Sequence, residues 1–88
     1  MAPKPDLGLL PSGPLSMALL LELEPAGLRR LLKFGLRGGL PHAGLESVLQ
    51  AEWSWSITDP EAEALLQALA DKGWFVRQVD VWKTHLAR

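Results

Sequence analysis

The chain has 88 residues, of which 48% are hydrophobic and 22% are charged, and its formal net charge is −1 at pH 7. These values are typical of one small globular domain. The chain has no cysteine, which excludes disulfide bonds and thiolate zinc sites, and its charge balance lacks the basic excess that small DNA-binding domains usually have.

The first 14 residues are a proline-rich arm. Prolines stand at positions 3, 5, 11 and 14, which excludes a helix there and favours an extended conformation. Leu7, Leu9 and Leu10 give the arm apolar side chains that need a surface to pack on. We expect residues 15–88 to form a single domain. The arm packs on that domain in a monomer, or reaches away from it in an assembly.

Three helices, each opened by a proline, are expected next. The first runs from Pro14 to about Leu23, the second from Pro25 to the Gly38-Gly39 pair, and the third from Pro41 to about Glu52. Apolar residues recur at helical spacing in the second and third helices, at Leu28, Leu31, Leu32, Leu36, Leu45, Val48 and Leu49.

A fourth helix is expected from about residue 60 to residue 72. Thr58 or Asp59 can cap its first amide groups, a proline suits its first turn, and Glu61 can complete a capping box. Gly73 is expected to end it in the left-handed conformation.

Residues 74–86 fit two conformations. As two strands, 74–78 and 81–86, they have the valine, tryptophan, phenylalanine and threonine that strands favour. The intervening Val79-Asp80 pair, however, lacks the glycine or asparagine of a two-residue hairpin turn. As a helix, the segment places Phe75, Val79, Trp82 and Leu86 on one face. We expect the hairpin, and the helix remains the alternative.

The run from Leu65 to Arg77 is a leucine-rich helix followed by a lysine–glycine stop and an aliphatic strand ending in arginine. This run resembles the winged helix-turn-helix superfamily, and the resemblance covers residues 26–87. It implies a mainly α, winged-helix-like domain of about four helices with a C-terminal β-hairpin. The three core helices of that family correspond to the second, third and fourth helices expected here. The chain departs from the family pattern in its long connector at 52–58 and in a hairpin tip without glycine. It also departs in the acids at the start of the third core helix, which is the fourth expected helix.

If residues 74–86 are helical, the chain is instead similar to the death-fold family. The segment from Leu31 to Arg37 and the amphipathic end of the chain carry that similarity. It implies an all-α six-helix bundle as the alternative fold.

A basic block lies on the second helix. Arg29, Lys33 and Arg37 are spaced i, i+4 and i+8, with Arg30 beside them. Like charges at this spacing destabilise an isolated helix by about 0.2–0.5 kcal/mol per pair, so something should offset them. One hypothesis is an anionic partner that binds the block. The other is a solvated face, or pairing with the chain's own acids, for which the candidates are Glu46, Glu52 and Glu61.

Acidic residues open the fourth helix, where a DNA-reading winged helix would place its base contacts. Acids there stabilise the helix dipole, but they also repel phosphate. We therefore prefer a protein partner or self-association to nucleic acid. Nucleic-acid contact through the hairpin remains the alternative, and its candidate residues are Arg77, Lys83 and His85.

The connector from Trp53 to Ile57 holds two tryptophans. Trp53 and Trp55 alternate across Ser54, so an extended connector would point them to opposite sides. Trp53 continues the stripe of the third helix and is expected to be buried. Trp55 is then expected to be exposed at a homo- or hetero-oligomer interface.

The sequence contains no recognisable catalytic, metal or cofactor motif. We expect a non-enzymatic binding module without cofactor, which mediates protein–protein interaction as an adaptor, regulatory subunit or homodimer. The alternative is a winged-helix DNA-binding transcriptional regulator. The apolar run from Met17 to Leu23 is too short to span a bilayer, and no signal peptide is evident, so we expect a cytoplasmic protein without membrane contact.

Overall fold

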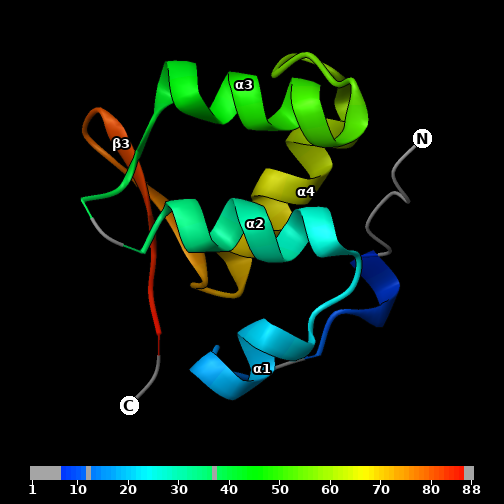
Figure 1. Ribbon diagram of the computed structural model, residues 1–88, viewed down its shortest axis with the longest axis vertical. Helices are drawn as coiled ribbons and strands as arrows, with labels where there is room; N and C mark the ends of the chain where they lie inside the picture. The colour runs from blue at the N-terminus through cyan, green and yellow to red at the C-terminus, as the bar shows by residue number, and fades with distance from the viewer. Residues whose placement is uncertain (1–6, 12, 37, 87–88) are drawn as a thin grey trace.

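A computed structural model describes residues 7–11, 13–36 and 38–86 of the chain. These residues form a short 3₁₀ helix, four α-helices and three β-strands (Figure 1). Their bounds are Leu7–Leu9 (η1), Met17–Glu22 (α1), Ala26–Phe34 (α2), Leu40–Pro41 (β1), His42–Trp53 (α3), Pro60–Asp71 (α4), Phe75–Gln78 (β2) and Val81–Thr84 (β3). The expected mainly α architecture with four helices and a C-terminal hairpin is confirmed, whereas β1 was not predicted. Arg37 and arm positions 1–6 and 12 lie outside the described residues.

The three strands form one antiparallel sheet in the order β1-β3-β2. Leu40 of β1 pairs with Trp82, and β2 pairs with β3 along its whole length. A strand between the first two core helices that joins the C-terminal hairpin is compatible with a winged-helix-like fold. The helical alternative for residues 74–86 is wrong, and with it the all-α six-helix bundle, because this segment is paired as strands.

The turn between β2 and β3 consists of Val79 and Asp80. Val79 has a φ of 55°, in the left-handed region that β-branched residues rarely adopt. Two-residue hairpin turns need positive φ, which glycine or asparagine usually supplies. The valine is therefore strained, and the pairing of the two flanking strands holds it in place.

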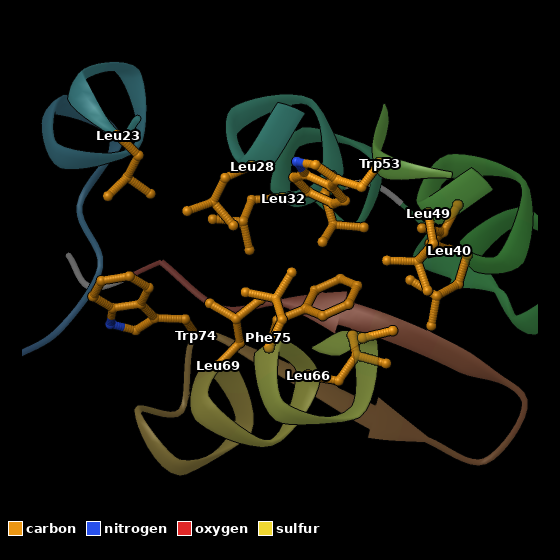
Figure 2. Packing of buried hydrophobic residues seen from close by; sticks show 14 of the residues in the cluster. Leu23, Leu28, Leu32, Leu40, Leu49, Trp53, Leu66, Leu69, Trp74 and Phe75 are labelled. Atoms are coloured by element: carbon orange, nitrogen blue, oxygen red, sulfur yellow. The ribbon is translucent and has the colours of Figure 1, made fainter. Parts of the chain in front are cut away.

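The helices and the sheet enclose one apolar core. Figure 1 shows α2 between α1 and α3, with α4 crossing behind them and the sheet along one side. Leu28 and Leu32 point from α2 toward Phe75, and Leu69 of α4 lies on the opposite side of the core (Figure 2). The core is built mainly of leucine, as the helical spacing of leucines in the sequence indicated.

At two helix ends a left-handed residue is followed by a tryptophan. Gly73 has a φ of 74°, and the Trp74 N–H donates to the Leu69 carbonyl at 3.0 Å. Ser54 has a φ of 57°, and the Trp55 N–H donates to the Leu49 carbonyl at 3.2 Å. The bonds at Gly73 form a Schellman motif, because the Trp74 bond spans five residues and the Gly73 N–H donates to the Ala70 carbonyl. The Trp55 bond spans six residues, so the end of α3 is a wider variant. The expectation for Gly73 is confirmed.

The start of α4 differs from the expected cap. Asp59 occupies the N-cap position, but its side chain makes no hydrogen bond to the helix. Its Oδ2 instead accepts from the Ser56 N–H at 2.8 Å. The Asp59 carboxylate therefore stabilises the turn between Ser56 and Asp59 that precedes α4, and it does not cap the first amide groups of the helix.

The described part of the arm packs on its own domain. Lys72 Nζ donates to the Pro11 carbonyl at 2.9 Å, and Trp74 Nε1 donates to the Gly13 carbonyl at 2.8 Å. Leu7 and Leu10 lie partly buried against the core. This is the arrangement expected of a monomer, and the described arm is not fully extended, because η1 interrupts it.

The end of β3 is fastened to the end of α2. The Thr84 N–H donates to the Gly35 carbonyl at 2.9 Å, and Thr84 Oγ1 donates to the Leu32 carbonyl at 2.6 Å. These bonds engage one carbonyl of the last turn of α2, which also accepts from the Gly35 N–H, and the carbonyl of the C-cap residue Gly35. Thr84 is 8% exposed, so the junction is closed to water.

Gly35→Ala should destabilise the domain. A Cβ at position 35 would lie 2.5 Å from Thr84 Oγ1 and 2.7 Å from Phe75 Cε1, so β3 must move away from α2. Overpacking of this kind typically costs about 1–3 kcal/mol. Chemical denaturation measures the loss. Gly38→Ala is the control, because nothing lies within 4 Å of its added Cβ, and it should change stability by less than about 1 kcal/mol. Equal effects of the two substitutions would contradict the tight junction.

Candidate functional site

Two residues of the basic block, Arg29 and Arg30, make contacts within the chain. Arg30 donates through Nε and Nη2 to the two carboxylate oxygens of Glu52, in a bidentate pair that joins α2 to α3. This hydrogen bonding, reinforced by the charge attraction, holds the pKa of Glu52 below its ordinary value of 4.5. It also raises the pKa of Arg30. Arg30 is therefore held in the fold, although its side chain remains half exposed.

Arg29 is also engaged by its own chain. Its Nη1 donates to the Leu23 carbonyl at 2.6 Å and lies 3.5 Å from Glu24 Oε1. Lys33 is exposed and makes no ion pair within the described part of the chain. Pairing with the chain's own acids therefore holds for two residues of the block, but only Glu52 was among the candidate acids, since the acid beside Arg29 is Glu24. Arg37, the remaining member, lies outside the described residues.

The two tryptophans of the connector are both buried. Trp53 is 6% exposed and Trp55 is 7% exposed, and their rings stack with centroids 5.1 Å apart. The expectation that Trp53 is buried is confirmed, and the expectation that Trp55 is exposed is wrong. The reason is the left-handed Ser54, which reverses the chain so that the two side chains share one side. With both rings covered, Trp55 is no longer a candidate for partner contact.

The three basic candidates on the hairpin do not gather on one face. Arg77 pairs across the strands with Trp82, whereas Lys83 pairs with Val76 on the opposite face of the sheet. His85 follows on the same side as Lys83, where its Nε2 lies 3.2 Å from Gln78 Nε2. Arg77 and His85 are exposed and Lys83 is half-buried. The hairpin therefore divides its basic side chains between the two faces of the sheet.

The opening turn of α4 is acidic and faces solvent. Glu61 and Glu63 are both exposed there. One turn further on, Gln67 Nε2 donates to Asp71 Oδ1 at 2.8 Å. The exposed face of α4 therefore presents oxygen acceptors along most of its length.

A groove lies between this face of α4 and strand β3. Its volume is about 310 Å³, and it is lined by Glu63, Leu66, Gln67, Ala70 and Trp82. The sequence prediction missed this site. The signal was present, because the four α4 residues follow one another at i, i+3, i+4 and i+7, but the position of Trp82 over them depends on the register of the sheet.

Trp82 has a polar atom without a partner in this setting. Its Nε1 is buried and makes no hydrogen bond among the described residues. Its ring stacks on Phe75 with centroids 5.4 Å apart. The indole is thus fixed in place with its donor unused.

The described part of the chain was also compared with two other kinds of functional feature, a metal site and a membrane-spanning helix. No group of three or more histidine, cysteine, aspartate or glutamate residues comes together there to hold a metal ion. Within the same residues, no helix has the length and apolar character needed to cross a bilayer. The groove and the α4 face offer hydrogen bonding, apolar contact and charge.

Several apolar side chains are exposed outside the groove. Met17 and Leu21 are 46% and 54% exposed, and their i, i+4 spacing places them on one face of α1. Phe34 is 55% exposed at the end of α2. Single exposed apolar residues are common on protein surfaces, so these residues do not by themselves mark a site.

Trp55→Ala should destabilise the domain strongly. The substitution removes a buried ring that stacks on Trp53, and truncation of core aromatics typically costs about 3–5 kcal/mol. Urea denaturation measures the loss. The matched control is Phe34→Ala, which removes an exposed ring and should cost far less. A stable Trp55→Ala protein with impaired association would restore the interface interpretation.

The Arg30–Glu52 pair should make stability depend on pH. Because the folded pKa of Glu52 is lowered, the pair stabilises the fold at and above pH 4.5. Its contribution is lost as the pH falls through the folded pKa. Glu52→Gln should therefore be less stable than the parent at pH 7, and the difference should shrink as the solution becomes more acidic. Thermal melts across this range test the trend.

The control for this measurement is Glu22→Gln on α1. Glu22 is exposed and makes no ion pair with the described residues. Its substitution should leave the pH dependence of the melting temperature unchanged. A Glu52→Gln curve that runs parallel to the parent at all pH values would exclude the pair as the source.

Comparison with models of known protein families, with curated protein sequences and with solved structures finds no significant match to this chain. A function for the chain therefore has to be argued from the geometry of its own residues. The strongest features of that geometry are the acidic face of α4 and the groove beside it.

Proposed function

We propose that the chain is a non-catalytic, winged-helix-like binding module whose partner is a protein, as an adaptor, a regulatory subunit or a homodimer. The order β1-β3-β2, with β1 between the first two core helices, supports the winged-helix-like part of the proposal. In that fold α4 takes the place of the helix that reads DNA.

The observation that carries the proposal is the acidic start of α4. Glu61 and Glu63 are exposed in the first turn, where a DNA-reading helix would approach the phosphate backbone. Carboxylates there repel phosphate, and phosphate neutralisation supplies much of the affinity of DNA-binding proteins. A protein surface that offers cations or hydrogen-bond donors is the better complement.

The distribution of basic residues supports the same partner class. Arg29 and Arg30 are engaged within the chain. The cations of the hairpin are divided between the two faces of the sheet. A basic stripe that could follow one phosphate backbone is therefore not assembled from the described residues.

A winged-helix DNA-binding regulator is the second candidate. Arg77 is exposed near the hairpin tip, where wings contact nucleic acid, and Lys83 is partly exposed on the other face. These two residues supply the variants that separate the candidates.

Titration of labelled DNA duplexes at physiological salt tests the proposal. We expect sequence-independent binding no tighter than about 10⁻⁶ M, as for non-specific contacts. Replacing Arg77 and Lys83 with alanine should change it by little. Sub-micromolar, sequence-dependent binding that falls in the double variant would overturn the proposal in favour of the regulator. Sedimentation analysis of the same samples separates a homodimer from a monomer that needs another protein.

A further inference from the structure

The unpaired donor on Trp82 stands out against the other buried polar groups of the fold. Thr84 Oγ1 donates to the Leu32 carbonyl at 2.6 Å, and Trp74 Nε1 donates to the Gly13 carbonyl at 2.8 Å. Trp82 Nε1 has less than 1 Å² exposed and no acceptor among the described residues. A buried N–H without an acceptor costs free energy, so a folded protein seldom retains one without a cause.

The groove beside this indole has an apolar floor and an acceptor-rich rim. Leu66, Ala70 and the Trp82 ring form the apolar part. The rim carries the carboxylate of Glu63 and the side chain of Gln67. Gln67 uses one of the two N–H groups of Nε2 on Asp71, so its carbonyl oxygen and its second N–H remain to bind a ligand. The carboxylate of Glu63 therefore favours donors or a cation at the rim, and the buried N–H of Trp82 lacks an acceptor among the described residues.

We propose that this groove binds an extended segment of a partner protein, which places a lysine or arginine against Glu63 and Gln67 and a backbone carbonyl on Trp82 Nε1. The proposal rests on the proposed protein-binding function and names its surface. A peptide supplies the missing acceptor and the missing cation together. Nucleic acid does not, because the carboxylate of Glu63 repels phosphate.

The size of the groove agrees with this occupant. Its volume of about 310 Å³ lies at the lower end of the range of small-molecule pockets, roughly 300–1,000 Å³. It therefore suits one or two side chains of a peptide better than a whole cofactor.

Binding requires a small movement at the rim. Since less than 1 Å² of Trp82 Nε1 is exposed, an acceptor reaches it only after a neighbouring side chain turns aside. Glu63 and Gln67 are exposed and have several rotamers available. The indole itself stays in place through its stacking on Phe75, so the donor is fixed before the partner arrives.

A random heptapeptide library displayed on phage, selected against the full chain, supplies the probe. We expect the enriched peptides to contain lysine or arginine. In ¹H–¹⁵N NMR spectra, a synthetic enriched peptide should shift the Trp82 indole N–H. The Trp74 indole, already bonded to Gly13, serves as the internal reference and should not move.

Two variants test the assigned contacts. Glu63→Lys should weaken peptide binding by about tenfold or more, as expected for a lost hydrogen bond to a charged group. Trp82→Phe keeps a ring to stack on Phe75 and removes the donor, and should weaken binding by about threefold to tenfold. Glu22→Lys makes the same charge change on α1 and should leave binding unchanged.

The donor can be checked without any ligand, but the melting temperature of Trp82→Phe does not isolate it. That substitution also removes part of the ring that packs on Phe75, so the donor itself is read from the indole N–H signals of the free parent protein. Because hydrogen bonding moves an N–H proton downfield, the Trp82 signal should lie upfield of the Trp74 signal, whose donor is bonded to Gly13. A Trp82 signal as far downfield as that of Trp74 would mean that the N–H is bonded in the free protein, and would overturn the proposal.

Two further results would also overturn the proposal that this groove binds a peptide. One is a selection that enriches no peptide. The other is an enriched peptide that binds Glu63→Lys as well as the parent and leaves the Trp82 indole unmoved. In that second case the chain still binds protein, but through another surface. The proposed protein-binding function itself is overturned by a different result, which is sub-micromolar, sequence-dependent binding of DNA.

Discussion

The contact between Thr84 and the end of α2 is the constraint on which the rest of the structure depends. Two hydrogen bonds from Thr84 fasten β3 to the Leu32 and Gly35 carbonyls, and the approach is close enough that only glycine fits at position 35. Trp82 lies two residues before Thr84 and on the same face of the strand. The two hydrogen bonds of Thr84 therefore also fix the position of the Trp82 indole, which forms one wall of the groove beside α4.

The elements that the sequence predicted well are those with strong local signals. Prolines mark the starts of α2, α3 and α4, leucines at helical spacing mark the buried faces, and both kinds of signal act within a few residues. Gly73 is the clearest case, because few residues other than glycine adopt its left-handed conformation readily. Two expected helix ends were wrong: α1 begins after a Ser16 cap rather than at Pro14, and α2 ends at Phe34, before the Gly38-Gly39 pair. The hairpin was expected from composition alone, and its strained Val79 turn forms because strand pairing outweighs a local preference.

The features that could not be predicted depend on contacts between distant segments or on weak local signals. A strand of two residues such as β1 has no periodicity to detect, and it exists only because β3 pairs with it. Ser54 adopts a left-handed conformation, which the presence of a serine does not predict. This is why the burial of Trp55 was missed. The pair of Arg30 with Glu52 joins residues 22 positions apart, so the sequence named Glu52 as one of three candidate acids but could not choose among them. The groove combines both difficulties, since α4 and β3 meet only in the folded chain.

The central position of β3 has a consequence for cooperativity. This strand holds β1 on one side and β2 on the other, and it is bonded to α2 at its end. It therefore cannot detach alone, because its release would free both neighbouring strands and open the end of a core helix. Local opening of β3 then approaches the free energy of global unfolding, and amide hydrogen exchange in this strand reports on the unfolding of the whole domain.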